Sequence, residues 1–445
     1  MSAADGRGFT RSGIVAGLGV RRVCWRTLSS PMRRTIVLSL LFALAAGVVC
    51  ALRPLKAVDL HVYYATARSF FLQSGPMYGP NREFGWPMMY RYPPLFICLF
   101  RPFASLPLGA AAGVWAALKI LLLGPLVWVW YRRYPPSRLV PALCISALLL
   151  LPYLLYELQV GNVQLFLVEM ACLALLLCDQ HPIVASLLFG LGTAIKVWPG
   201  LVLFFLAVRG HARWRIGLQA LAAAGALTVA PGFWLGWSNV VNLLKQWFLQ
   251  EQRINALLGD RWYPSQSLRG VMLRYFTRVD YSGLPDQNYR QVSLLSLPSW
   301  EVRQFWLVLA LVLALLALVW VYRCANEGAA YSILFCSLLI IEPNVQRIAY
   351  AALLWPVLYT GIVITDPKAS RFTRWVLMGA AAVALLEPLI PGAAPQRLAQ
   401  ILGIDFFGVL VPLAIAHLAY SSWGLNSSLW KPSRNGAASL PGDET

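Results

Sequence analysis

Long hydrophobic runs separated by short polar segments follow one another along almost the whole chain. A membrane-spanning helix needs about 20 consecutive apolar residues, and on that scale the runs accommodate about a dozen spans. The runs are 35–52, 108–131, 139–156, 165–178, 183–208, 216–235, 303–322, 329–341, 348–365, 375–390 and 404–420. The pattern predicts an all-α polytopic membrane protein, with one transmembrane domain over residues 35–422.

Two apolar runs depart from the simple pattern of one run for one span. The run between Pro94 and Pro102 is too short for a straight span, so we predict a half-helix that returns to the same face. The run 183–208 is interrupted at Lys196 and Pro199. Proline removes a backbone donor and favours an extended residue before it, so this run is predicted to form two short helices that meet at Lys196.

Basic residues predict the orientation of the helices. Arginine and lysine gather in short loops, and such loops usually stay in the cytoplasm. The segments predicted to be cytoplasmic are 1–34, 132–133, 209–215, 323, 368–374 and the tail 423–445. The first outer loop after residue 52, the Gly161–Gln164 turn, Lys196, the large polar segment 236–299 and the 342–347 turn then share the outer face.

Composition excludes several other classes of protein. Hydrophobic residues make up 59% of the chain and charged residues 12%, values that water-soluble domains do not reach. The formal charge of +19 is explained by cytoplasmic loops and anionic lipid headgroups, so nucleic acid is not predicted as a partner. The eight cysteines form no CxxC pair, and no metal-binding or glycine-rich phosphate motif is present. Neither a metal nor a cofactor is predicted.

The first outer loop carries the first candidate for chemistry. Aromatic residues recur there at helical spacing, which predicts one or two interfacial helices. Asp59 stands at the start of this segment. A carboxylate at that place can take the proton of an attacking hydroxyl, or it can simply cap an amphipathic helix. The residues alone favour neither interpretation.

Three cations on the predicted outer face could bind a phosphate: Lys196, Arg91 and Arg347. A lysine deep in apolar sequence is expensive unless it is paired or hydrated, and broken helices often build sites for charged ligands. Arginine matches phosphate oxygens with two parallel hydrogen bonds. The alternatives are a snorkelling lysine for Lys196, an interfacial arginine for Arg91, and neutralisation of Glu342 by Arg347.

Aromatic and amide side chains on the same face suit the recognition of sugar rings and hydroxyl groups. The candidate substrate-binding residues are Tyr63, Tyr92, Asn162, Gln164, Trp198, Trp262, Tyr263, Gln266 and Gln346. The alternatives are helix caps for the amides and an interfacial aromatic belt for the rings.

Four short motifs carry a resemblance to a known family. They are R-Y-P-P-L at Arg91–Leu95, G-N-V-Q at Gly161–Gln164, K-V-W-P at Lys196–Pro199 and S-Q-S-L at Ser265–Leu268. Together with an aspartate after the first helix, their order resembles the GT-C superfamily of membrane glycosyltransferases. The chain looks most like glycosyltransferase family 87, the polyprenyl-phosphate-mannose-dependent mannosyltransferases.

The resemblance implies that Asp59 is the general base of an inverting transfer from a polyprenyl-phosphate sugar, with mannose as the default. The acceptor would be a glycolipid or a glycan at the outer face of a bacterial cytoplasmic membrane. Family members often carry a Ser-Pro turn with tryptophan and histidine late in the chain. Here the matching segment is Glu342–Arg347, in which the histidine contact is either missing or replaced by Gln346 or Arg347.

Two rival functions remain open at this stage. A secondary transporter would have inverted repeats and acidic residues at mid-membrane depth, and the sequence shows neither. A non-catalytic accessory protein of lipid-linked glycan assembly would tolerate the loss of Asp59, which the enzyme would not.

Overall fold

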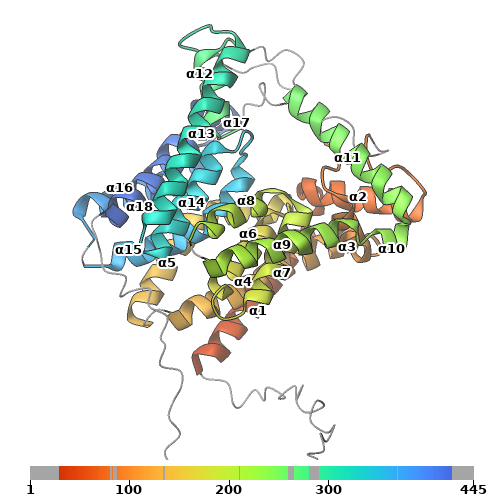
Figure 1. The fold of residues 1–445 in the computed structure, drawn as a ribbon, viewed down its shortest axis with the longest axis horizontal. Helices are drawn as coiled ribbons and strands as arrows, with labels where there is room; N and C mark the ends of the chain where they lie inside the picture. The colour runs from red at the N-terminus through yellow and green to blue at the C-terminus, as the bar shows by residue number, and fades with distance from the viewer. Residues whose placement is uncertain are drawn as a thin grey trace, which may run out of the picture.

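The computed structural model describes residues 30–80, 83, 88–133, 136–209, 211–258, 265–279, 290–367 and 369–422. Within these residues every regular element is helical, as the apolar pattern predicts (Figure 1). The first half contains α1 (Ser30–Leu52), η2 (Pro54–Lys56), α2 (Val58–Leu72), α3 (Pro94–Ala104), α4 (Leu108–Arg133), α5 (Pro136–Val160), α6 (Gln164–Leu177), α7 (Pro182–Ile195), α8 (Trp198–Ala207) and α9 (His211–Val229). The second half contains α10 (Gly232–Leu235), α11 (Trp237–Leu258), α12 (Leu268–Phe276), α13 (Ser299–Arg323), α14 (Glu327–Ile341), η3 (Arg347–Leu353), α15 (Leu354–Thr365), α16 (Arg371–Leu386), η4 (Glu387–Leu389), α17 (Ala393–Leu402), η5 (Phe406–Leu410) and α18 (Val411–Ser422).

Several helices are long and apolar enough to cross a membrane. Within the described ranges, five helices pass by length and composition, and a sixth span is possible if the pair α17 and η5–α18, bent by 58°, crosses as one unit. Shorter apolar helices, such as Gln164–Leu177 and Pro182–Ile195, account for other hydrophobic runs. The chain is therefore a multi-pass membrane protein, and the number of about twelve spans stays a prediction.

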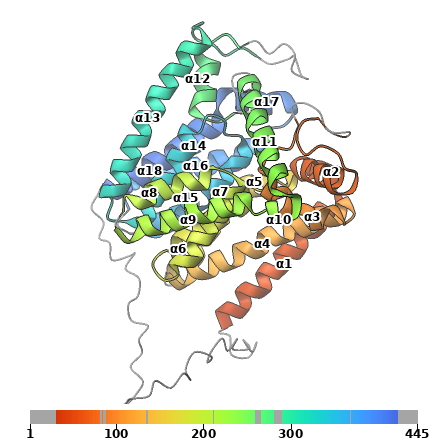
Figure 2. The ribbon, with the colours of Figure 1, turned by 45° about the vertical axis from the view of Figure 1, so that its right-hand side comes forward.

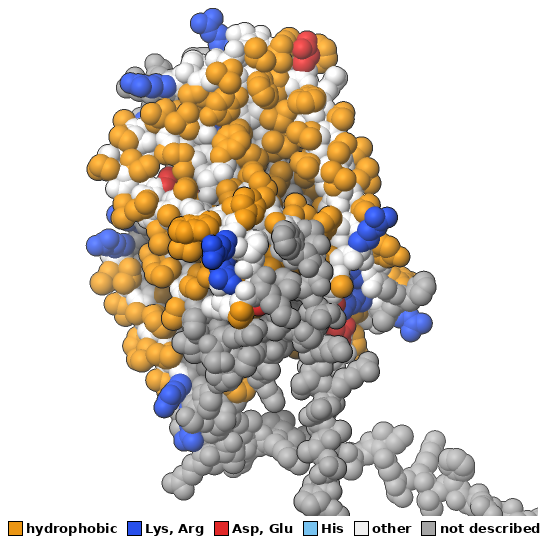
Figure 3. Space-filling view, turned by 90° about the vertical axis from the view of Figure 1, so that its left-hand side faces the viewer, with side chains coloured by type: hydrophobic (Ala, Val, Ile, Leu, Met, Phe, Trp, Pro, Cys, Tyr) orange, Lys and Arg blue, Asp and Glu red, His pale blue; other side chains and the backbone are white. Residues whose placement is uncertain are grey.

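The outer surface of the helix bundle fits a hydrocarbon environment. Figure 2 shows α13 at the edge of the bundle, where it packs on α12 and α14. Large apolar side chains of α13 such as Phe305, Leu311 and Leu316 are exposed. Hydrophobic side chains also cover most of the described part of the face in Figure 3, with few charges among them. In water such a surface would be unfavourable, whereas lipid chains solvate it.

Both predicted irregularities of the apolar runs appear as short helices. The helix α7 ends at Ile195, Lys196 is extended with φ −149° and ψ 137°, and α8 begins at Trp198. The prediction of a helix break at Lys196 is thus confirmed. The helix α3 has only 11 residues, which confirms a short helix after Pro93, while its return to the same membrane face stays a prediction.

The described part of the polar segment 236–299 contains two helices that the sequence analysis did not predict. The helix α11 follows α10 directly, and in Figure 1 it runs from the region of α2 and α10 towards α12. The second is α12, which packs on α13. Another unpredicted helix is α17. All three are short or mixed in polarity, so a search for long apolar runs does not find them.

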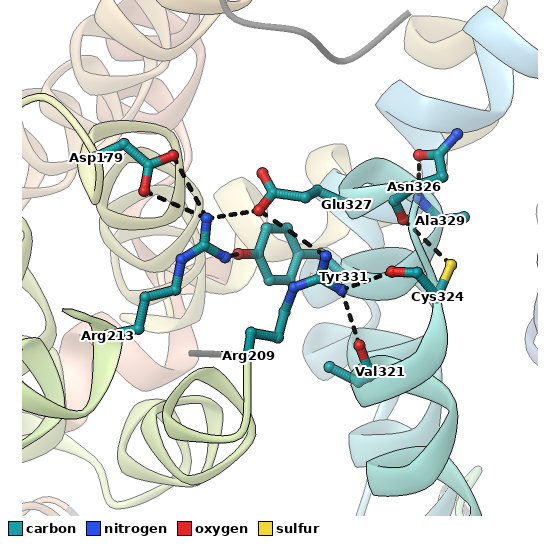
Figure 4. A network of polar contacts seen from close by, with 9 residues as sticks. All are labelled: Asp179, Arg209, Arg213, Val321, Cys324, Asn326, Glu327, Ala329 and Tyr331. Carbon is teal, nitrogen blue, oxygen red and sulfur yellow. Dashed lines mark hydrogen bonds and ion pairs between the residues drawn. The ribbon is translucent and has the colours of Figure 1, made fainter. Parts of the chain in front are cut away.

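Segments that the charge pattern places on the cytoplasmic side contact one another in a polar network (Figure 4). The Arg213 guanidinium donates to the Tyr331 hydroxyl at 2.7 Å and pairs with Asp179 at 3.2 Å and Glu327 at 2.5 Å. Arg209 donates to backbone carbonyls at the end of α13. These contacts join three segments: the one between α6 and α7, the one between α8 and α9, and the one between α13 and α14. The three segments therefore lie together at one end of the bundle.

Candidate active site

Asp59 lies in the first turn of α2, beside the turn that connects α5 to α6. The short helix η2 separates α2 from α1, and α2 buries Leu60, Tyr63 and Tyr64 against the protein. This burial fixes the helix and leaves the Asp59 side chain half-buried. Its Oδ2 atom accepts a hydrogen bond of 2.6 Å from Nδ2 of Asn162.

Four candidate residues form one polar line that begins at Asp59. Asn162 donates to Asp59, and the Asn162 Oδ1 atom accepts the backbone N–H of Gln164 at 2.9 Å. The Gln164 Oε1 atom in turn accepts a hydrogen bond of 3.1 Å from Nζ of Lys196. The four side chains come from α2, the α5–α6 turn, the start of α6 and the break between α7 and α8. The Asp59 carboxylate and the Lys196 ammonium group therefore lie at the two ends of this line, with the amide groups of Asn162 and Gln164 between them.

The surroundings change the acidity of Asp59. Burial removes water from the charged carboxylate and raises the pKa of Asp59 above its ordinary value. The hydrogen bond from Asn162 and the positive charges of Lys196, Lys119 and Arg91 oppose this rise in pKa without cancelling it. The carboxylate is thus more basic than that of an exposed aspartate, which suits a group that must accept a proton.

Arg91 is held by α11 through a bidentate ion pair. Its Nε and Nη2 atoms donate to the two carboxylate oxygens of Glu251 at 3.0 and 2.7 Å. Trp247 and Gln250 donate to the backbone carbonyls of Arg91 and Tyr90. A phosphate at Arg91 would have to share the guanidinium with Glu251. The sequence analysis missed these α11 residues, although the i, i+3, i+4 spacing of 247, 250 and 251 marks one face of a helix.

Tyr63 and Tyr92 lie in an aromatic cluster. Their hydroxyl groups are 3.0 Å apart, and the ring of Phe96 contacts both rings. Both tyrosines are buried, and the Tyr78 hydroxyl donates to the Tyr92 carbonyl at 2.8 Å. The cluster holds the 90–94 turn against α2, and a role of these rings in substrate binding stays a prediction.

The S-Q-S-L motif packs on the turn that follows α14. The backbone N–H of Gln266 donates to the Val345 carbonyl at 2.5 Å, and the Ser267 hydroxyl donates to the Pro343 carbonyl at 2.9 Å. The Gln266 side chain donates to the Gln400 carbonyl. These contacts hold the end of α14, and with it Glu342, which interacts electrostatically with Lys196.

The remaining candidates differ in their surroundings. Arg347 forms an ion pair with Glu387 and lies over the Tyr153 ring at 5.5 Å, so its described contacts are with residues outside the Asp59 line. Gln346 is exposed, and Trp198 is half-buried next to the helix break. Trp262 and Tyr263 lie outside the described residues. Among the described residues, no group of three or more His, Cys, Asp or Glu side chains could hold a metal ion.

Gly161 allows the α5–α6 turn to approach α2, and its replacement is expected to disturb the site. Its φ is +76°, and an added Cβ atom would lie 2.6 Å from Cβ of Leu60. We expect Gly161→Ala to lower the free energy of unfolding by at least about 2 kcal/mol, because backbone strain and overpacking add. Thermal unfolding in detergent measures this loss.

Gly225→Ala in α9 is the matched control, because an added Cβ there has open space and a helical backbone. It should leave stability unchanged or slightly raised. Equal melting temperatures for the two variants would contradict the close approach at Gly161.

Comparison with known proteins identifies the class of this chain. A sequence model of glycosyltransferase family 87 matches residues 90–343, which is more than half of the chain. The chain belongs to glycosyltransferase family 87, and its apolar helices make it a membrane-embedded member of that family.

One characterised relative is the polyprenol-phosphate-mannose-dependent alpha-(1-2)-phosphatidylinositol mannoside mannosyltransferase of Mycobacterium tuberculosis. It is 30% identical over 237 residues, which cover 49% of this chain and 53% of the relative. The match thus extends over about half the length of that protein. No solved structure matches this chain.

Proposed function

We propose that this protein transfers a sugar, by default mannose, from a polyprenyl-phosphate donor to a glycolipid or glycan acceptor. The observation that supports this most directly is the line from the Asp59 carboxylate through Asn162 and Gln164 to the Lys196 ammonium. It offers a base for the acceptor hydroxyl and a cation for a departing phosphate within one polar site. The matched relative uses a donor of this kind, according to its name.

The chemistry follows from the two ends of this line. The acceptor oxygen attacks the anomeric carbon of the donor sugar while Asp59 takes the hydroxyl proton. The bond between that carbon and the phosphate oxygen breaks, and the lipid phosphate leaves with the bonding electrons. Lys196 stabilises the negative charge that develops on the phosphate, and Arg91 adds a second positive charge nearby. A single displacement of this kind inverts the anomeric configuration.

The same proposal includes the orientation and limits of the domain. Residues 35–422 form the transferase domain, and the flanking segments 1–34 and 423–445 are cytoplasmic because of their basic residues. The Asp59 site then faces the exterior of the cytoplasmic membrane. A lipid-linked donor suits that side, because it stays in the membrane while nucleotide sugars stay in the cytoplasm.

The donor class is tested with membranes that contain the wild-type protein. We expect radiolabel to pass from polyprenyl-phosphate-mannose into a glycolipid or glycan fraction, and no transfer from a nucleotide sugar such as GDP-mannose. The matched control is membrane from the same host without the protein. If a panel of polyprenyl-phosphate sugars gave no transfer above this control, the proposal would give way to a transporter or accessory role.

A further inference from the structure

A buried pair of charges lies beside the α5–α6 turn and contacts its backbone. Lys119 of α4 and Glu157 of α5 are both 0% exposed, and the lysine Nζ atom lies 2.9 Å from each carboxylate oxygen. Taking two charges out of water is expensive, and apolar replacements of such pairs are often as stable. The pair therefore calls for an explanation other than stability alone.

The other hydrogen bonds of the pair that involve described residues reach the backbone of this turn. The Lys119 ammonium donates to the Asn162 carbonyl as well as to Glu157. The Glu157 Oε1 atom accepts the backbone N–H of Leu165 at 3.1 Å. The indole of Trp115 donates to the Gly161 carbonyl at 2.9 Å. Each end of the turn is thus fixed by a buried side chain from α4 or α5.

The turn held in this way presents the Asn162 side chain to Asp59. The Asn162 backbone carbonyl is bound to Lys119, while its side-chain amide donates to the Asp59 carboxylate at 2.6 Å. A shift of the turn by a fraction of this distance would weaken the bond, because hydrogen bonds lose strength steeply with poor geometry.

We propose that Lys119 and Glu157 are positioning residues, which clamp the 161–165 turn so that Asn162 holds the Asp59 carboxylate. Neither side chain needs to contact substrate. This inference rests on the proposed function, since it assigns to the pair a part in setting up the proposed base. The pair also orders the turn, and this structural role is independent of the reaction.

The decisive variant replaces the whole pair, Lys119→Met with Glu157→Leu. Removal of both charges leaves no unpaired buried charge, so the fold is expected to persist. Without the clamp Asn162 no longer holds Asp59, so the ionised carboxylate loses a charge-assisted hydrogen bond. We expect kcat to fall at least tenfold. The acid limb, which is the fall of kcat towards low pH, should move to a higher pH by about one unit, because the pKa of Asp59 rises when the hydrogen bond is lost.

Other charged and titratable groups also affect the pKa of Asp59. The charged and titratable groups that interact with it are Lys196, Lys119, Arg91, Glu157, Tyr63 and Tyr92. Because the double replacement removes one positive and one negative charge, its direct electrostatic effect on Asp59 largely cancels. Asn162→Ala should produce the same upward movement of the acid limb. In the Asn162→Ala background, replacement of the pair should add no further movement.

Glu169→Gln is the matched control for replacement of a buried polar side chain in this region. Glu169 is 1% exposed and interacts electrostatically with Glu157 and Lys119, but its carboxylate oxygens have no hydrogen-bond partner among the described residues. It should leave both kcat and the acid limb unchanged.

Hydrogen exchange of the turn separates failure of the clamp from failure of the proposed function. In the double variant the amides of Gln164 and Leu165 should exchange at least tenfold faster, while exchange in α14 and α15 stays unchanged. Faster exchange in a protein whose wild type transfers no sugar would support the clamp and overturn the function. Sugar transfer with an unmoved acid limb and unchanged exchange of the turn would overturn the clamp.

Discussion

Asp59→Asn is expected to reduce sugar transfer by about 10²–10⁴-fold, the usual contribution of a positioned general base. Asparagine keeps the size of the side chain and a hydrogen-bonding oxygen for Asn162, but it cannot accept the acceptor's proton. The loss should appear in kcat, because the base acts on a proton that moves in the transition state. Initial rates of radiolabelled mannose transfer, normalised to the amount of folded protein, give the measurement.

Glu83→Gln provides the matched control for Asp59→Asn. Glu83 follows α2 in the same polar segment, and its carboxylate lies 2.9 Å from His61 rather than in the Asp59 line. Both substitutions remove one negative charge near α2, so a general electrostatic effect would reduce transfer in both. Full activity of well-folded Asp59→Asn would exclude Asp59 as the base and leave it as a structural partner of Asn162 in the first turn of α2.

The raised pKa of Asp59 gives the same prediction a pH signature. A base works only when it is ionised, so transfer should fall as pH drops through the pKa of Asp59 in the folded protein. Because burial raises that pKa, the fall should occur at a higher pH than the ordinary aspartate value of about 3.9. The acid limb belongs to kcat and should have a slope of one proton. An acid limb at or below the ordinary value would contradict the described environment.

Short local signals were enough to predict part of the site. Pro199, three residues after Lys196, predicted the helix break, and this break places the lysine at the end of the polar line. The G-N-V-Q motif likewise predicted a polar turn, because glycine and asparagine accept the backbone conformations that such turns need. These signals act over a few residues, so the sequence shows them without any knowledge of tertiary contacts.

Other parts of the site depend on contacts between distant segments. Glu251 meets Arg91 only because α11 returns over the first outer loop, 160 positions further along the chain. Arg347 was a candidate for phosphate, yet its ion pair with Glu387 exists because η4 folds back towards η3. Lys119 is different, since a lysine inside an apolar run is itself a signal. The sequence does not show that Glu157 is its partner, because this ion pair depends on the packing of α4 and α5.

Lys196→Met is expected to reduce kcat by about 10²–10³-fold, the typical cost of removing a group that stabilises transition-state charge. In the described structure Lys196 donates to the neutral amide of Gln164, whereas Arg91 is paired with Glu251 in two hydrogen bonds. Lys196 can therefore turn to a phosphate without giving up a hydrogen-bonded carboxylate. Kinetics with varied donor concentration separate this loss in kcat from a change in KM.

Two further variants, Lys196→Arg and Lys245→Met, serve as controls for Lys196→Met. Arginine keeps the positive charge and should therefore restore part of the rate. The rescue should be incomplete, because the planar guanidinium differs in geometry from a compact ammonium group. Lys245 is exposed on α11, so Lys245→Met changes the net charge equally and should leave kcat unchanged. A lysine that only snorkels to the interface would give a different result, in which Lys196→Met lowers stability and leaves the rate per folded molecule intact. Partial rescue by arginine therefore favours a role for the charge at the departing phosphate.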